Sequence, residues 1–404
     1  MNFFWKSLAL LLYLALGLTT CFAADSDLFK AAEELQQLKT QAASTTYIFW
    51  VHGDAEHFVS KSLSDSRFVN IDQIDVARIH IYAKQCHDCN VLIYHDPRGS
   101  DTWWKLRNKQ SSRFWVYING HLVLSRRQPE SSVQESSFLA ELLSFPHRNG
   151  LGADPYFIYR GHTIPPTKSL TGVFDLSNLN LRYNIKDLAK SIKESGQHLR
   201  GIVLAACESA YLENFLELSP YADWIIAPQH LIVEREITGF DFSWVKSVHF
   251  LHKTNLQRAR YIAHAIMNRF ENTFNIEEAR GEYPVTLFHS PNRAITHELN
   301  LLAQEMKKDI IEMSLDKRMQ LRSTRGLSAR YAAALLSKFG DNEPTRRIFK
   351  LLEYSPYENS FDYVQSLKYL YPKHPLLSKI KQSIEVFHLG YKSKSSGMSF
   401  LILE

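Results

Sequence analysis

The sequence predicts an α/β protein with a mostly parallel sheet and helices on both of its faces. Three observations support this fold class. From residue 47 to residue 227, segments with strand character alternate with segments of helical periodicity. The strand segments are continuous apolar runs, which strands buried on both faces require. After about residue 250 helical patterns dominate, which predicts a mainly helical C-terminal region.

Apolar patterning and turn residues define the elements of the first half. Asn119-Gly120 lies between two apolar segments and is typical of a type I′ hairpin turn. Ile74, Ala77 and Ile81 follow one another at helical spacing. In chain order we expect a strand over 47–51, a helix over 71–83, a strand over 91–94, a hairpin over 114–124, a helix over 133–143 and a strand over 156–159.

The alternation continues from Asn184, a good N-cap residue for a helix that reaches position 193. An apolar strand over 201–206 then ends at Cys207, and a helical pattern begins close behind it. A further strand over 221–227 is stopped by Pro228.

The rest of the chain divides into predicted helices and two strand signals. The helices are expected over 256–270, 294–313, 327–339, 345–352, 361–371 and 375–388. The strand signals lie at 285–288 and 398–403, and we expect the terminal one to return to the sheet. We therefore divide the chain into a signal peptide (1–24), an α/β domain (25–250) and a mainly helical region (251–404) that ends in this strand.

The N-terminus has the pattern of a signal peptide. Lys6 precedes an apolar run over 8–16, and small residues follow with cleavage expected after Ala23 or Ala24. A membrane anchor is the alternative, but the run is shorter than the roughly 20 residues that a span needs. Lipid attachment at Cys21 is a minor alternative. The sequence thus predicts export to the periplasm or the cell exterior, with no membrane span after cleavage.

Composition excludes some classes of partner. The chain has 404 residues, a formal net charge of +5, 45% apolar residues and 22% charged residues. This balance is ordinary for a globular protein, and the charge is too small to indicate nucleic-acid binding. The oligomeric state is left open.

The four cysteines divide into one pair and two single residues. Cys21 leaves with the signal peptide, and Cys86 and Cys89 are natural disulfide partners, so Cys207 remains unpaired. A C-x-x-C motif can also be a redox pair or half of a zinc site. Here it precedes a strand instead of following one, and no further metal ligands are patterned around it. We therefore predict a local disulfide and no metal.

Cys207 and His162 are the candidate catalytic residues. Each comes at the end of an apolar strand, and the ends of parallel strands form the usual ligand crevice of α/β proteins. A thiol and an imidazole together form a nucleophile with an acid/base partner. The alternatives are a buried structural cysteine and His52, another strand-end histidine, as the base.

The order of these motifs resembles the clostripain-like (C11) cysteine peptidases of the caspase-like clan CD. The resemblance rests on the first strand with its His52-Gly53-Asp54 ending, on the helix over 138–143 before the strand that leads to His162, on Ala206-Cys207 and on the strand over 221–227. It implies a caspase-like three-layer α/β sandwich whose catalytic domain is 25–250, with Cys207 as nucleophile and His162 as general acid/base. It also implies that the amides of Cys207 and of the turn from Gly161 to Thr163 bind the oxyanion.

The sequence departs from this family at the position two residues before the cysteine. Ala205 stands where the family has an Asp that receives a basic P1 side chain, and Thr163 stands where it has Gly. Glu234 and Glu236 are candidates to supply the missing charge. We expect an exported cysteine endopeptidase with a protein or peptide substrate and no cofactor, with calcium implied by the resemblance alone. The alternatives are an inactive relative that binds a peptide or protein partner in the same cleft, and a thiol oxidoreductase using Cys86 and Cys89.

Overall fold

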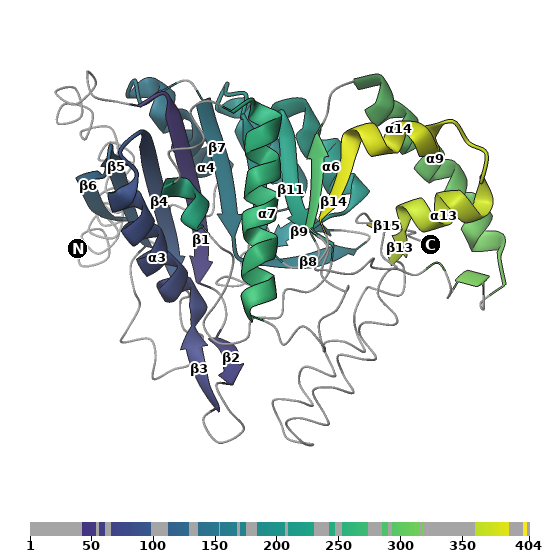
Figure 1. The fold of residues 1–404 in the computed structure, drawn as a ribbon, viewed down its shortest axis with the longest axis horizontal. Coiled ribbons are helices and arrows are strands. Elements are labelled where there is room, and N and C mark those ends of the chain that lie inside the picture. The colour runs from purple at the N-terminus through teal and green to yellow at the C-terminus, as the bar shows by residue number, and fades with distance from the viewer. Residues whose placement is uncertain are drawn as a thin grey trace, which may run out of the picture.

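A nine-stranded sheet forms the centre of the fold (Figure 1). The computed structural model describes residues 43–53, 56–60, 66–97, 112–128, 136–152, 154–167, 170–174, 184–206, 209–229, 242–246, 253–273, 285–289, 293–314, 317–318, 321, 360–387 and 399–401. The sheet contains β1 (Thr45–Gly53), β4 (Cys89–Pro97), β5 (Ser112–Ile118), β6 (His121–Gln128), β7 (Asp154–Arg160), β10 (Gly201–Ala205), β11 (Trp224–Pro228), β12 (Val285–His289) and β14 (Ile384–Phe387). Their order is β14-β12-β11-β10-β7-β1-β4-β5-β6.

The five central strands of this sheet run parallel. β4, β1, β7, β10 and β11 pair with their neighbours in parallel, while β5 and β6 on one side and β12 and β14 on the other pair antiparallel. These five parallel strands are all among those predicted from continuous apolar runs, because a strand covered on both faces needs apolar side chains at every position.

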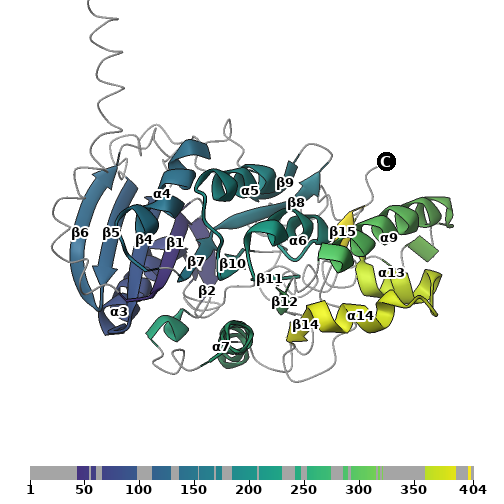
Figure 2. The ribbon, with the colours of Figure 1, turned by 90° about the horizontal axis from the view of Figure 1, so that it is seen from above.

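Helices cover both faces of the sheet (Figure 2). One face carries α4 (Ser136–Arg148), α5 (Ile185–Glu194) and α6 (Leu212–Leu218), and the other carries α3 (Ile71–Gln85), α7 (Asn255–Thr273) and the short helix η6 (Ser243–Lys246). Successive residues of β1 alternate between the two cores: Ile48 and Trp50 pack toward α4 and α5, and Phe49 and Val51 pack toward α3.

The helix predicted over 71–83 is confirmed as α3, but the apolar residues whose spacing predicted it do not form its buried face. Ala77 is exposed and Ile81 is 53% exposed, whereas Val76, Ile79 and Asp75 are buried against the sheet. Assigning the face from apolar residues alone fails here because a carboxylate occupies one of the inward positions. Its partner is Arg160, the last residue of β7.

Two local predictions are confirmed at atomic level. In the β5–β6 turn, Asn119 has φ 47° and Gly120 has φ 84°, as a type I′ turn requires. A Cβ at Gly120 would also lie 2.8 Å from the carbonyl oxygen of Lys84, so only glycine fits. At the start of α5, the side chain of Asn184 accepts hydrogen bonds from the amides of Lys186 and Asp187 and forms a capping box.

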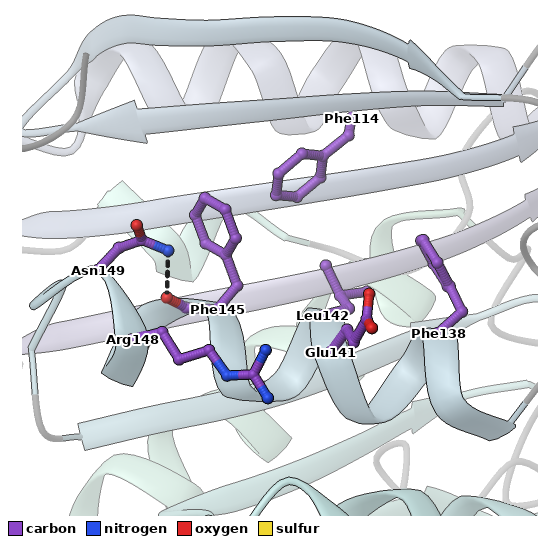
Figure 3. A pocket seen from close by; sticks show the side chains of 7 residues that line it. All are labelled: Phe114, Phe138, Glu141, Leu142, Phe145, Arg148 and Asn149. Atoms are coloured by element: carbon purple, nitrogen blue, oxygen red, sulfur yellow. Dashed lines mark hydrogen bonds between the residues drawn. The ribbon is translucent and has the colours of Figure 1, made fainter. Parts of the chain in front are cut away.

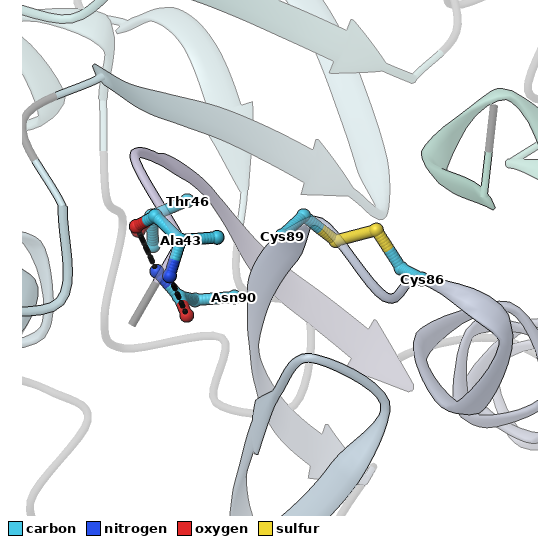
Figure 4. The surroundings of a disulfide bond; sticks show 5 residues. All are labelled: Ala43, Thr46, Cys86, Cys89 and Asn90. Atoms are coloured by element: carbon cyan, nitrogen blue, oxygen red, sulfur yellow. Dashed lines mark hydrogen bonds between the residues drawn. A yellow bond between two sulfur atoms is a disulfide. The ribbon is translucent and has the colours of Figure 1, made fainter. Parts of the chain in front are cut away.

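The predicted disulfide between Cys86 and Cys89 is confirmed, with a Cα–Cα distance of 5.7 Å (Figure 4). It closes the turn between the end of α3 and the beginning of β4, and both cysteines are buried. Both cysteines therefore belong to the apolar core on the α3 side of the sheet.

The C-terminal region contains α9 (Arg293–Glu312), α13 (Tyr363–Leu370), α14 (Leu376–Ser383) and two short strands, β13 (Ser360–Asp362) and β15 (Ser399–Leu401). The prediction that the terminal strand returns to the main sheet is wrong. This strand, β15, pairs with β13 in a separate two-stranded sheet. The strand that does reach the main sheet is β14, within the segment predicted as helix 375–388.

Some predictions fall outside the described residues. These are the signal peptide over 1–24 with Cys21, and the helices over 327–339 and 345–352. Within the described segments, no helix combines the length and apolarity needed to cross a bilayer. The boundary at residue 250 stays a prediction, although β12 and β14 beyond it extend the sheet begun by the first half.

Candidate active site

Four parallel strands share one row of paired residues at or near their carboxyl ends. In this row the Cα atom of Val51 in β1 is paired with His95 in β4 and Arg160 in β7, and Arg160 is paired in turn with Ala205 in β10. Ligand crevices of α/β sheets lie at this edge, because the loops after neighbouring parallel strands emerge there. The predicted site residues follow directly on these strand ends.

His162 and Thr163 begin a separate hairpin. Gly161 alone separates β7 from β8 (His162–Thr167), which pairs antiparallel with β9 (Leu170–Phe174), and Thr163 pairs with Val173. The break predicted over Gly161 to Thr163 is therefore confined to Gly161, which is buried. His162 thus stands two residues after Arg160, at the point where the chain leaves the main sheet.

His52, the alternative base, is the penultimate residue of β1, where its Cα is paired with Asp96 of β4. A similar strand pair, β2 (Glu56–Ser60) and β3 (Ser66–Asn70), follows β1 in the chain.

The strand that leads to Cys207 is fully enclosed. Ala205 and Ala206 each have no exposed surface. Cys207 lies outside the described residues, as do Glu234 and Glu236. The described chain resumes at Ser209, whose buried hydroxyl donates a hydrogen bond to the carbonyl oxygen of Ala206 at 2.9 Å. The amide of Ala210 donates to the carbonyl oxygen of Pro228 in β11 at 2.9 Å, so the two described ends of this short connection are both fixed to the sheet.

Ala205 supplies no charge to the place where the resemblance expects an acid. Its side chain belongs to the apolar core that faces α3. Its carbonyl oxygen lies 3.5 Å from Nη1 of Arg160, a donor on the adjacent strand.

A buried ion pair that sequence reasoning missed lies at this edge. Nε of Arg160 donates to Oδ2 of Asp75 in α3 at 2.6 Å, and the side chains are 6% and 0% exposed. A sequence signal exists on each side: Asp75 interrupts the buried stripe of α3, and Arg160 ends the apolar strand β7. Neither signal predicts that these two residues form a pair, because they are 85 positions apart in the sequence.

Further polar residues surround the ends of β4 and β5. Asp96 is buried and accepts a hydrogen bond from the hydroxyl of Ser112 at 2.7 Å. His80 of α3 lies with Nδ1 2.8 Å from the hydroxyl of Tyr117. Burial, followed by Coulomb interactions with Lys84 and His95, lowers the pKa of His80 to about 4. His80 is therefore neutral at pH 7.

A surface pocket lies elsewhere, between α4 and β5 (Figure 3). It is lined by Phe114, Phe138, Glu141, Leu142, Phe145, Arg148 and Asn149. It opens on the face of the sheet opposite to α3 and contains none of the predicted catalytic residues. The described residues also contain no group of three or more His, Cys, Asp or Glu side chains able to hold a metal ion.

Structural comparison identifies the fold. A secreted C11 cysteine protease from Bacteroides thetaiotaomicron, "iotapain", superposes with a TM-score of 0.57 at 12% identity, over 89% of this chain and 94% of its own. A structure of a secreted C11 cysteine protease from the same organism with an irreversible peptide inhibitor gives 0.56 at 14% identity, over 90% and 93%. An inactive zymogen C11 protease from Parabacteroides distasonis gives 0.51 at 13% identity, over 90% and 93%.

No protein-family profile and no curated protein sequence matches the chain. The structural matches extend over nearly all of the chain and of each neighbour. The chain therefore has the caspase-like three-layer α/β sandwich fold found in C11 cysteine proteases, and the predicted fold class is confirmed.

Proposed function

We propose that this protein is an exported, clostripain-like cysteine endopeptidase in which Cys207 is the nucleophile and His162 the general acid/base. The observation that carries the proposal is the pairing of Arg160 with Ala205 on adjacent parallel strands. His162 follows two residues after Arg160, and Cys207 follows two residues after Ala205. Adjacent strands lie about 4.8 Å apart, so the two chains reach the edge of the sheet within side-chain reach of each other.

The proposed reaction is acyl transfer to a thiol. The Cys207 thiolate attacks the scissile carbonyl carbon, and the carbonyl oxygen becomes an oxyanion that backbone amides of Cys207 and Gly161 stabilise. The imidazolium of His162 gives its proton to the leaving amine as the C–N bond breaks. Water then attacks the acyl-enzyme, His162 accepts its proton, and the carboxylic acid and free thiolate are released.

The proposal includes export and a peptide substrate. Support for export comes from the predicted signal peptide and from solved relatives in fold that are described as secreted C11 proteases. Support for peptide binding comes from the neighbour solved with an irreversible peptide inhibitor. We propose no cofactor for the chemical steps, since a thiol and an imidazole supply both the nucleophile and the proton transfers.

The P1 preference depends on the charge near Ala205. This residue is apolar and buried, so a basic P1 side chain would need Glu234 or Glu236 as its partner. Without such a partner, burying a P1 cation would cost more free energy than burying a neutral side chain, and neutral P1 residues would be preferred.

A positional-scanning peptide library tests the proposal in one experiment. We expect the purified protein to cleave at a defined P1 residue, Cys207→Ala to be inactive, and His162→Ala to be slowed by about 10²- to 10⁴-fold. His52→Ala is the matched control and should remain within about threefold of wild type. Absence of cleavage by wild type across pH 5–9, with and without calcium, would contradict the proposal. Full activity of Cys207→Ala would contradict the assignment of the nucleophile.

A further inference from the structure

The guanidinium group of Arg160 connects three elements at the proposed site. Its own residue ends β7, its Nε donates to Asp75 of α3 at 2.6 Å, and its Nη1 lies 3.5 Å from the carbonyl oxygen of Ala205 in β10. A guanidinium is planar and presents several donors in a fixed fork, so one side chain can hold two acceptors in a set relative position.

The two strand ends that it connects are those that lead to the proposed catalytic residues. Arg160 is two residues before His162, and Ala205 is two residues before Cys207. The chain leaves the main sheet immediately after Arg160, at the buried Gly161. Any shift of Arg160 relative to Ala205 would therefore be passed to both proposed catalytic residues through only two peptide units.

The ion pair is not needed to attach α3 to the sheet. Val76, Ile79 and Ala83 of this helix are buried in the core below it, and the disulfide closes the turn from its end into β4. Desolvation of two charges offsets much of their attraction, and well-packed apolar residues are often as stabilising as a buried ion pair. A buried pair at this place thus calls for another explanation than stability.

We infer that Arg160, held by Asp75, is a positioning residue that sets the relative placement of the strand ends bearing His162 and Cys207. This inference rests on the proposed function and adds to it a residue pair outside the catalytic dyad. Small misplacements of reacting groups are costly, since a shift of about 1 Å can lower a rate by about 10²-fold. The effect should fall on kcat, because Arg160 and Asp75 are both buried and would act through the placement of the catalytic residues.

Two variants test this inference. The first keeps a positive charge beside Asp75, and the second removes both charges of the pair. Arg160→Lys keeps the positive charge but loses the fork that reaches Asp75 and Ala205 together. The double variant Arg160→Met with Asp75→Leu replaces the pair by apolar side chains of comparable length. Rates are measured per active site, counted by titration with a peptidyl acyloxymethyl ketone, and thermal unfolding is recorded for each variant.

We expect kcat to fall by more than tenfold in both variants, with KM within about twofold and the double variant unfolding at or above the wild-type temperature. The matched control is Arg200→Lys, at the other end of the same strand pair. Nε of Arg200 donates to Asp154 of β7 at 2.7 Å, in an Arg–Asp ion pair that is more exposed and lies at the amino end of the two strands. This control should keep the wild-type kcat.

The outcomes separate the inference from the proposed function. Wild type that cleaves peptides through Cys207, combined with wild-type kcat in both Arg160 variants, overturns the inference alone. If Arg200→Lys lowers kcat as much as the two Arg160 variants do, the inference is also overturned. A wild-type protein with no Cys207-dependent cleavage overturns the proposed function itself.

Discussion

Asn90 is the residue that holds the beginning of β1 in place. Its Nδ2 donates to the carbonyl oxygens of Ala43 at 2.8 Å and Leu151 at 3.1 Å, and to the hydroxyl of Thr46 at 3.1 Å. Its Oδ1 accepts a hydrogen bond from the amide of Ala43 at 3.3 Å (Figure 4). The side chain is fully buried, so its loss leaves these backbone groups without that partner away from water.

We predict that Asn90→Ala lowers the free energy of unfolding by about 2–4 kcal/mol, because several buried hydrogen bonds are lost and a small cavity forms. Chemical denaturation measures the change. The control is Asn300→Ala on α9, where the asparagine is exposed and the change should lie within about 0.5 kcal/mol. Equal effects of the two substitutions would contradict this role of Asn90.

His80 makes the stability of the protein depend on pH. Its pKa is lowered to about 4 in the folded protein, chiefly by burial, from an ordinary value of 6.5. Between these two values the unfolded chain binds a proton that the folded protein does not, so protonation favours unfolding. Stability contributed by neutral His80 is therefore fully present above about pH 6.5 and decreases as the pH falls toward 4.

We predict that His80→Gln, which cannot be protonated, loses less stability than wild type when the pH is lowered from 7.5 to 4.5. Urea denaturation at several pH values gives the comparison. The difference in unfolding free energy between the two proteins should change steadily over this interval. A difference that is constant with pH would show that the folded-state pKa of His80 is ordinary.

At the scale of elements, short sequence patterns predicted those features that depend only on residues close together in the chain. The Asn184 cap of α5 and the β5–β6 turn depend on neighbouring residues, and both could be predicted. The inward face of α3 could not, because its burial of Asp75 depends on Arg160 in a distant strand. The placement of β14 and β15 depends likewise on their pairing with β12 and β13, and short segments carry little periodicity of their own.

The cap of α5 gives a prediction at this scale. Asn184→Ala removes the side-chain acceptor for the amides of Lys186 and Asp187 and should lower the free energy of unfolding by about 1 kcal/mol. Asn184→Asp keeps an acceptor in the same place, so it should stay close to wild type. Thermal unfolding distinguishes the two. Similar losses in both variants would contradict the capping role.

At the scale of the whole molecule, the order of strands along the chain predicted the fold, and the location of the site stays a prediction. The parallel strands β1, β7 and β10 share the row of Val51, Arg160 and Ala205, and the predicted residues His52, His162 and Cys207 come one or two positions after this row in the sequence. The sequence also indicated that Cys86 and Cys89 pair with each other. The connection between Arg160 and Asp75 could not be predicted, because it arises from the packing of a helix against a strand 85 residues away.

The most direct test of the central claim is covalent labelling of the proposed nucleophile. Purified wild type, Cys207→Ala and His162→Ala are treated with a set of peptidyl acyloxymethyl ketones that differ in the P1 residue, and the products are analysed by intact mass and peptide mapping. We predict one adduct per wild-type molecule, located on Cys207, no adduct on Cys207→Ala, and labelling of His162→Ala slowed by about 10²-fold or more. An unlabelled wild-type protein, or an adduct on another residue, would contradict the proposal that this protein is a cysteine peptidase with Cys207 as its nucleophile.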